Sequence, residues 1–198
     1  MATSRANKNI SQFKSKLIGG GARPNLFEVE LTTLPPNVVS DWDADIFQFM
    51  CKAAALPAQN IANIDVPFRG RIFKVAGDRT IDTWTVTVIN DEDFRIRNAF
   101  EEWTQQIANL DTNIGATDPS AYMTNAKVFQ LGRGTTKSSK DSNGTDNVVL
   151  KEYDFVDIFP TTVSSIDLSY DTGDTIEEFT VEFQVQSLNL AGAGSPNG

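Results

Sequence analysis

The sequence predicts a mainly β domain, an antiparallel β-barrel or sandwich with one long α-helix. Apolar and polar residues alternate along several segments, one segment has helical spacing, and Gly or Pro turns separate the segments. Most of the predicted strands are neighbours in the sequence, which favours antiparallel pairing. With 198 residues, 40% of them hydrophobic, the chain is long enough to bury one core, and the helix is expected to plug one opening of the barrel.

The alternation predicts about eight strands. In the clearest of them Trp84, Val86 and Val88 face the core, while the Thr residues between them face away. A Gly turn at Gly77-Asp78-Arg79 is expected before it, and Pro160 is expected to close a later segment. A hairpin turn is expected at residues 172–174. The strands are predicted over residues 26–31, 46–52, two segments of 60–75 around a turn at Gly70, 83–89, 126–131, 148–156, 166–170 and 178–188.

One helix of about 18 residues is predicted after Asn90. Asn90 is a good N-cap, and the acids at 91–93 suit the positive end of the helix dipole. The helical spacing comes from six apolar residues: Phe94, Ile96, Phe100, Trp103, Ile107 and Leu110.

The chain ends differ in composition from the domain at 23–188. Residues 1–22 are expected to form a flexible arm with a short helix near Ile10 to Leu17. This arm has four basic residues and no acid, so it is either a disordered tail or an arm that docks on an acidic neighbouring subunit. Residues 132–147 are expected to form a long exposed loop, and 189–198 a flexible tail.

The composition argues against several classes of function. The chain has no His and a single cysteine, Cys51, so a Ser-His-Asp or Cys-His nucleophile, a disulfide and a Cys-based zinc site are all excluded. A net charge of −9 repels phosphate backbones. No apolar run approaches the roughly 20 residues of a membrane span, and the N-terminus lacks a secretory signal, which indicates synthesis in the cytoplasm. We therefore expect no enzyme activity, no cofactor, no bound metal and no membrane anchor.

The acidic residues do not form an expected catalytic or metal site. Glu28 and Glu30 alternate along one strand, and nothing places a carboxyl with a raised pKa beside a partner, as a glycosidase needs. The acids at 41, 43 and 45 begin like a calcium loop but lack its Gly and its closing Glu. A solvated turn is the expected structure.

Two features suit assembly. Asp78 and Arg79 could form a solvated local ion pair or a pair across an interface. The outward strand positions are rich in Thr, Gln and acids and carry no Lys or Arg. They suit either an ordinary solvated face or the wall of a pore that lets a polyanion pass.

Four blocks of sequence carry a resemblance to a known family. They are 23–27 (RPNLF) with Val29-Glu30, 51–57 (CKAAALP), 75–92 (VAGDRT to NDE) with Trp103, and 159–161 (FPT) through Phe179. In order and spacing the chain resembles the tail tube proteins of contractile-tailed bacteriophages of the T-even type. It departs from that pattern in its long N-terminal arm, its enlarged 132–147 loop and its Gly-rich C-terminal tail.

The resemblance implies a β-barrel-like fold that forms hexameric rings. The rings would stack into a hollow tube in the virion tail, inside a contractile sheath and on a baseplate, and would be assembled in the host bacterial cytoplasm. The other implied partners are a tube terminator, a tape-measure protein, and DNA that passes without specific binding. The alternatives are the inner tube of a non-viral contractile injection or secretion machine, a monomeric ligand-binding β-barrel and a hydrolase.

Strand faces and the resemblance together predict two sets of residues. Contacts between subunits or rings are expected from the segment 42–57 and the Gly77 turn, namely Trp42, Phe47, Phe49, Leu56, Pro57, Asp78 and Arg79. Acids that face the lumen are expected among Glu28, Asp167, Asp171 and Glu182.

Overall fold

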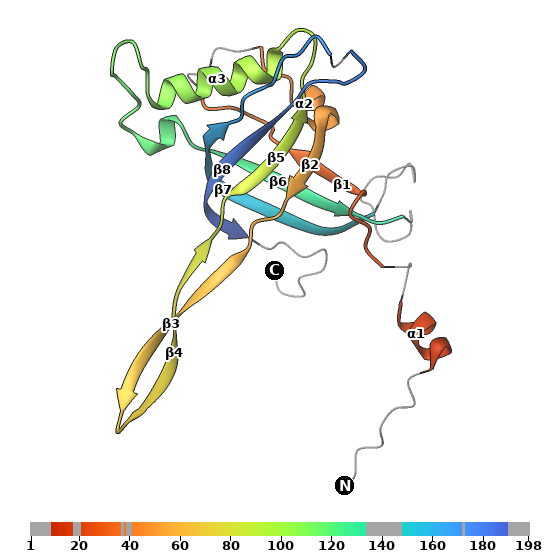
Figure 1. Ribbon diagram of the computed structural model, residues 1–198, viewed down its shortest axis with the longest axis vertical. Coiled ribbons are helices and arrows are strands. Elements are labelled where there is room, and N and C mark those ends of the chain that lie inside the picture. Colours follow the sequence, from red (N-terminus) through yellow and green to blue (C-terminus); the bar gives the residue numbers. More distant parts are fainter. Residues whose placement is uncertain are drawn as a thin grey trace. The chain divides into compact units, whose positions relative to one another are not determined.

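The computed structural model describes residues 9–17, 21–36, 38, 41–133, 148–171 and 173–189 (Figure 1). The chain divides into two units. The larger contains residues 29–128 and 153–190, and the smaller contains the described parts of 1–28 and 129–152. The predicted 132–147 loop from residue 134 onward, and the tail from residue 190 onward, lie outside the described residues.

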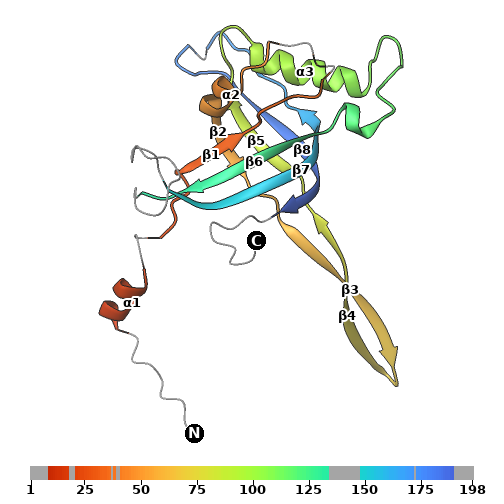
Figure 2. The ribbon, with the colours of Figure 1, turned by 180° about the vertical axis from the view of Figure 1, so that it is seen from behind.

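A six-stranded sheet, in the order β1-β6-β7-β8-β5-β2, forms the centre of the fold. It curls into a nearly closed, barrel-like form (Figures 1 and 2), which confirms the predicted fold class. β5 pairs antiparallel with both β2 and β8, and β8 also pairs antiparallel with β7. The strands are β1 (Phe27–Glu30), β2 (Cys51–Ala55), β5 (Trp84–Ile89), β6 (Thr124–Leu131), β7 (Val149–Val163) and β8 (Glu178–Asn189).

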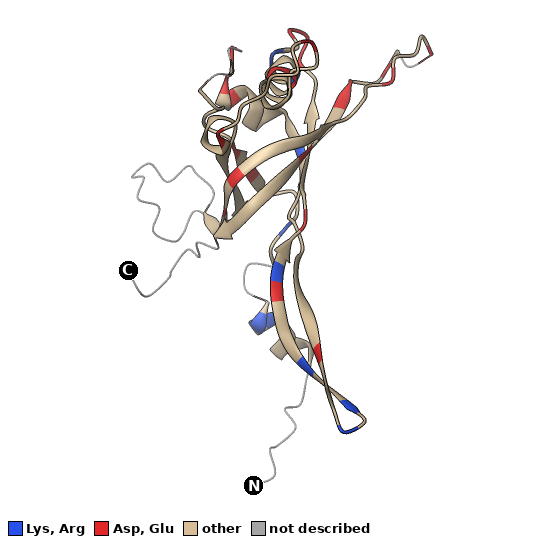
Figure 3. Cartoon of the chain, turned by 90° about the vertical axis from the view of Figure 1, so that its left-hand side faces the viewer, with Lys and Arg blue, Asp and Glu red and all other residues tan. Residues whose placement is uncertain are grey.

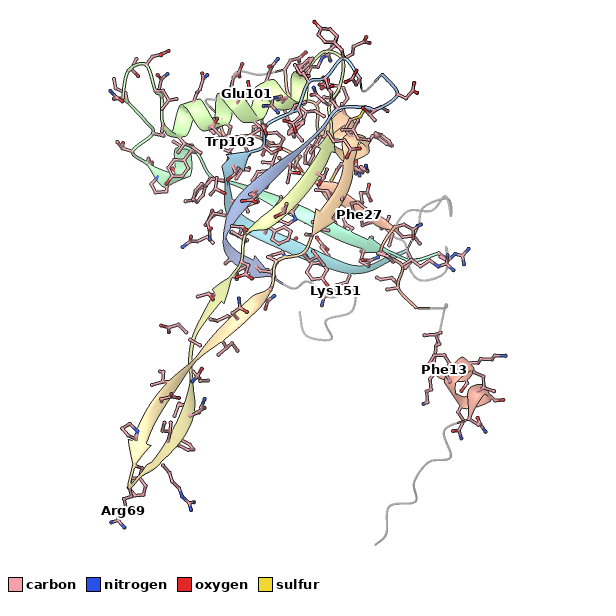
Figure 4. The ribbon with its side chains drawn as sticks, viewed as in Figure 1. Phe13, Phe27, Arg69, Glu101, Trp103 and Lys151 are labelled. Carbon is pink, nitrogen blue, oxygen red and sulfur yellow. The ribbon has the colours of Figure 1, made fainter. Side chains whose placement is uncertain are left out.

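An aromatic core fills the inside of this sheet. Trp84 stacks on Phe155 at 4.6 Å and on Phe183 at 5.1 Å between ring centroids, and all three side chains have no exposed surface. The helix α3 (Arg95–Ile107) covers the core with Phe100 and Trp103, whose rings lie 5.7 and 6.0 Å from Phe183. Figure 4 shows Trp103 pointing toward the sheet and Glu101 pointing away from it. The predicted helix thus packs on the sheet.

That helix is shorter than predicted. It begins at Arg95, and Asn90 is not its N-cap, because the Asn90 N–H donates to the carbonyl oxygen of Glu177 at 2.9 Å and so extends the pairing of the sheet. Phe94 precedes the helix in the left-handed region with φ of 57°. Leu110 lies beyond the helix and is 89% exposed.

The predicted strand at 46–52 is wrong. Its first part is the helix α2 (Ala44–Met50), and only Cys51 and Lys52 belong to β2. Asp43 caps this helix by accepting hydrogen bonds from the backbone N–H groups of Asp45 and Ile46. Phe47 and Cys51, four residues apart, are buried, whereas Phe49 is 83% exposed. The apolar residues therefore follow the helical period.

A second, two-stranded sheet is the hairpin of β3 (Gln59–Phe68) and β4 (Arg71–Ile81). The turn at Gly70 is confirmed; Arg69 and Gly70 both have positive φ, as two-residue hairpin turns require. The predicted turn at Gly77 is wrong, because this residue lies inside β4. A Cβ atom there would come within 3.1 Å of the carbonyl oxygen of Ala62, beside an irregularity in the pairing. The glycine permits close approach of the two strands.

Two further expectations fail between β7 and β8. β7 runs through Pro160 to Val163, and the pairing with β8 shifts directly after Pro160, where a bulge tolerates a residue without an N–H group. The strand predicted at 166–170 is a loop, in which Leu168 is 81% exposed. The alternation is present there, but among the described residues no strand pairs with this segment. Gly173 and Asp174 do lie in a turn.

The smaller unit contains the helix α1 (Ile10–Lys16), as predicted for the arm. A short 3-10 helix, Pro119–Ala121, precedes β6 in the larger unit. None of the helices in the described part of the chain combines the length and apolar character that crossing a bilayer would require.

Candidate assembly surfaces

The β3–β4 hairpin carries an apolar face on which none of the described residues packs. Val66 lies opposite Phe73, Ile64 opposite Val75 and Phe68 opposite Arg71, so these side chains share one face. Asn63, Asp65, Lys74 and the exposed Ile72 occupy the other. All ten residues of β3 are exposed. We call this apolar face the hairpin surface; its members, which are 42–66% exposed, are Ile64, Val66, Phe68, Phe73 and Val75.

The tip of the hairpin is basic in an otherwise acidic chain. Arg69, Arg71 and Lys74 lie close to the turn, which Figure 3 shows as blue segments and Figure 4 marks at Arg69. The Arg69 guanidinium lies 5.4 Å from the centre of the Phe68 ring. The hairpin, residues 59–81, has four basic and two acidic residues, whereas the whole chain has a net charge of −9. The tip is thus opposite in sign to the net charge of another copy.

The sheet face opposite the core is mostly polar, with Phe159 and Ile89 among its Thr, Gln and Glu side chains. Glu182 lies between Thr85 on β5 and Thr162 on β7, and no Lys or Arg nitrogen of a described residue lies within 4.0 Å of its carboxylate. Two lysines of the same sheet form ion pairs, Lys52 on β2 with Glu178 and Lys127 on β6 with Asp154 at 3.7 Å. We call this face, formed by Thr85, Thr87, Thr162, Thr180, Glu182 and Gln184, the polar sheet face.

The residues predicted for subunit contacts do not all lie on the surface. Trp42 is half-buried, and its Nε1 donates to the carbonyl oxygen of Leu31 at 3.1 Å. The Phe47 ring lies 5.2 Å from the Trp42 ring and has no exposed surface, so its side chain supports the core of the subunit. Phe49, at 83% exposed, and Leu56, at 43% exposed, are available to a neighbouring molecule.

Asp78 and Arg79 are exposed on β4 rather than in a turn. Adjacent residues of a strand point to opposite faces, so this placement does not favour a pair between them. The Arg79 guanidinium instead donates a hydrogen bond to the side-chain oxygen of Gln59 on β3.

The four predicted lumen acids occupy three different elements. Asp167 and Asp171 are exposed in the loop between β7 and β8, which lines an open groove of about 710 Å³. Glu182 lies on the polar sheet face, and Glu28 belongs to β1 in the smaller unit.

The described residues offer little for chemistry. Burial raises the pKa of the Cys51 thiol to about 12, so this group is almost entirely protonated at neutral pH and is a poor nucleophile. Among the residues that the structure describes, no three His, Cys, Asp or Glu side chains are grouped so that they could hold a metal ion.

Sequence reasoning missed the hairpin surface. Its signal was present as alternating apolar residues from Ile64 to Val75, beside a cluster of basic residues at Arg69 and Arg71. Alternation was interpreted only as a core-facing pattern, although it also marks a strand that a neighbouring molecule covers.

Residues 22–190 match the phage tail tube protein family. The chain belongs to that family. It is 37% identical to the tail tube protein gp19 of Enterobacteria phage T4 over 163 residues, which is 82% of this chain and 88% of that protein. The tail tube protein of Serratia phage KSP90 is 23% identical over 178 residues, covering 88% of this chain and 93% of that protein. This tail tube protein is therefore a structural component of a phage virion, of the contractile-tailed kind that the sequence resembles.

Solved structures share the fold of this tail tube protein at low sequence identity. The tube-terminating cap of the anti-feeding prophage has a TM-score of 0.57 and 17% identity, with 87% of this chain and 92% of that chain covered. The sheath–tube complex of the extracellular contractile injection system PVC, in the extended state, has a TM-score of 0.54 and 12% identity, with 94% and 99% covered. Both likenesses are likenesses of fold, and each extends over most of both chains.

Proposed function

We propose that six copies of this tail tube protein close into a ring and that stacked rings form the inner tube of a contractile tail, through which DNA passes from capsid to host. The hairpin surface carries this proposal. A single copy leaves five large apolar side chains of one hairpin face in water, although soluble monomers rarely expose such patches. A neighbouring copy that covers this face removes the cost.

The ring must overcome repulsion between its subunits. Six copies with a charge of −9 each carry −54 at pH 7. An obligate interface of about 2,000 Å² or more is expected, with apolar burial stabilising it by about 25 cal/mol per Å². The basic hairpin tip offsets part of the repulsion. The strands β1 and β2 end the order of the sheet and offer unpaired edges to neighbouring copies.

The polar sheet face is proposed as the wall of the lumen, with Glu182 as its central acid. Asp167, Asp171 and Glu28 are proposed beside it. Such a wall binds DNA weakly, because few of its groups can replace the counterions of the phosphates. At physiological salt the repulsion reaches only about 8 Å from the wall, so it prevents adhesion without obstructing the channel.

The partners are proposed from family membership. The similar structures include a sheath–tube complex, a baseplate and a terminator. We propose the same classes for this protein: sheath outside the tube, baseplate and terminator at its ends, and a tape-measure protein with DNA inside. Assembly in the host cytoplasm, with no catalysis and no cofactor, completes the proposal. Phe49, Leu56, Pro57, Asp78 and Arg79 are proposed contacts between subunits or rings.

Electron microscopy of the purified protein at rising concentration, with and without a baseplate fraction, tests the assembly. Six-fold rings or tubes are expected, and a single species that stays monomeric throughout would indicate a self-sufficient barrel instead. Genes for a capsid beside this one would distinguish a virion tube from the tube of a non-viral injection machine.

Cysteine labelling tests the lumen. In assembled tubes, the Glu182→Cys variant should react with a small maleimide. It should react poorly with a maleimide that carries a polyethylene glycol chain of about 10 kDa, because the wall of the tube keeps bulky reagents away from the lumen. Glu102→Cys, on the outward side of α3, is the matched control. Equal labelling of both variants by the bulky reagent would place Glu182 outside the lumen.

A further inference from the structure

The short helix α1 has an apolar stripe that nothing covers in the described chain. Ile10, Phe13 and Leu17 follow helical spacing and are 67%, 60% and 44% exposed. Lys14 and Lys16 flank this stripe on its two sides, while Ser15 lies on the opposite side of the helix.

A helix of this length requires a partner. Isolated helices shorter than about 12–15 residues are marginal in water, and α1 has only seven. Its cap is well formed, because the Asn9 side chain accepts a hydrogen bond from the Gln12 N–H at 2.8 Å. Such a cap contributes about 1 kcal/mol, which is too little to hold the helix alone. Burial of the stripe is the remaining source of stability.

The charge of the arm identifies its partner. Residues 1–22 contain four basic residues and no acid, which leaves 13 basic and 26 acidic residues in the remainder, a net of −13. The arm is thus complementary to the body of its own kind of chain. The family match begins at residue 22, so the arm lies outside the domain that the family shares.

The larger unit has a suitable acidic surface beside an exposed ring. Arg95 lies 3.8 Å from Asp41 and 3.3 Å from Asp93, which draws the start of α2 and the segment before α3 together. Phe94, held at φ of 57°, is 42% exposed beside them. The exposed acids of this segment are Asp41 and Asp93, both paired with Arg95, and Asp43, Asp45 and Glu92.

We infer that α1 of one copy docks on this acidic surface of a second copy, with its apolar stripe against Phe94 and with Lys14 and Lys16 among the carboxylates. The inference rests on the proposed function, because it needs neighbouring copies in an assembly. The chain between α1 and Arg23 includes Gly19-Gly20-Gly21, and six extended residues span at most about 20 Å. The arm therefore fastens adjacent copies to each other by a contact that the tube domain itself does not supply.

Disulfide trapping between two variants tests the contact. A full-length Phe13→Cys chain and a full-length Glu92→Cys chain are mixed, assembled and oxidised. Covalent dimers are expected at a yield about tenfold or more above that of Ser15→Cys with Glu92→Cys, because docking raises the effective concentration of the paired thiols. The native Cys51 gives little background, since it is buried.

Charge reversal provides the second readout. Lys14→Glu with Lys16→Glu should lower the dimer yield several-fold at low salt, and Asp41→Lys with Asp93→Lys in the partner should restore it. Dimer yields that stay the same after both charge reversals would overturn the inference. A third chain carries both Phe13→Cys and Glu92→Cys. Disulfides that form only within this chain, and not between the two mixed variants, would also overturn the inference. Cross-linking that requires added DNA or sheath protein would overturn it as well. If the wild type forms no rings, the proposed function fails; if rings form without cross-links, only the arm contact fails.

Discussion

Two strands of the same unit show opposite outcomes of the same sequence pattern. β5 and β3 both alternate apolar and polar residues. In β5 the side chains of Trp84, Val86 and Val88 have no exposed surface, whereas in β3 those of Ile64 and Phe68 are 54% and 66% exposed. The alternation determines that each segment forms a strand with an apolar face. It does not determine whether this chain or another molecule covers that face.

The difference arises from the neighbours of each strand. β5 lies between β8 and β2 and is covered by the aromatic core, while in the described part of the chain β3 and β4 pair only with each other. A two-stranded hairpin on its own is marginally stable in water. The larger unit therefore combines strands that bury their apolar face within the subunit with a hairpin whose apolar face is exposed, and we propose that assembly covers this face.

The largest expected effect comes from the core. Phe183→Ala should lower the free energy of unfolding by about 3–5 kcal/mol, because it removes a ring that touches both Trp84 and α3 and leaves a cavity. Urea denaturation of the dilute, unassembled protein measures the change. The matched control is Phe73→Ala on the hairpin, which should stay within about 0.5 kcal/mol of wild type. Similar losses in the two variants would show that the hairpin surface is covered within the subunit.

Cysteine reactivity distinguishes the two regions next. Cys51 begins β2 and its pKa is raised from 9.0 to about 12 by burial, so its thiolate fraction at pH 8 is lower than that of a free thiol by about 100- to 1,000-fold. Alkylation should be slower by about that factor. A cysteine introduced by Val66→Cys should react at an ordinary rate in the dilute protein. Fast alkylation of Cys51 in the wild-type protein, which has Val at position 66, would indicate that β2 opens readily.

The same shift has a consequence for stability. The folded chain favours the protonated thiol, so the stabilisation is complete below the unfolded pKa near 9 and is lost as the pH rises toward 12. Denaturation of wild type and Cys51→Ala between pH 8 and pH 11, which flank the unfolded pKa, should show a decline that is larger in wild type, because Lys and Tyr titrate in both chains. Parallel curves would contradict the assignment.

The strands of the closed sheet were predictable because local and tertiary signals agree there. β5 and β8 alternate strictly, and both bury the face that the pattern indicates. The helix α2 was missed because Phe47, Phe49 and Cys51 fit a period of two, although Phe47 and Cys51 alone also fit the helical spacing of four. The cap formed by Asp43 decides in favour of the helix.

The candidate assembly surfaces were only partly predictable, for a different reason. Phe49 and Leu56 are exposed, while Phe47 proved to be core. Which apolar side chains remain in water depends on long-range contacts such as the Trp42 ring on Phe47. A single sequence indicates which face of its strand or helix a residue occupies, but it does not indicate what packs against that face. That the hairpin surface is exposed could be recognised only once the structure showed that β3 and β4 form a sheet of their own.

A moderate effect is expected on assembly. In the proposed tube, Phe73→Ala removes a ring that a neighbouring copy buries, worth about 1.5–3 kcal/mol. The critical concentration for rings should therefore rise by about ten- to a hundredfold. Light scattering across a dilution series measures it. Asn63→Ala, on the opposite face of the same hairpin, is the control and should leave the critical concentration unchanged. Equal effects of both variants would show that the hairpin surface is not the contact.

The smallest effect is expected on the polar sheet face. Glu182→Gln removes a carboxylate with no cation within 4.0 Å among the described residues, so the unfolding free energy should change by less than about 0.5 kcal/mol. Glu178→Gln, which breaks the exposed pair with Lys52, should lower the free energy of unfolding by about 0–1 kcal/mol.

In rings, Glu182→Gln should have the larger effect of the two variants, because the loss of the unpaired Glu182 charge from every copy relieves repulsion around the lumen. The critical concentration of Glu182→Gln for ring formation should fall slightly at low salt and match that of wild type at high salt. A shift that does not depend on salt would show that the Glu182 residues of neighbouring copies lie far apart.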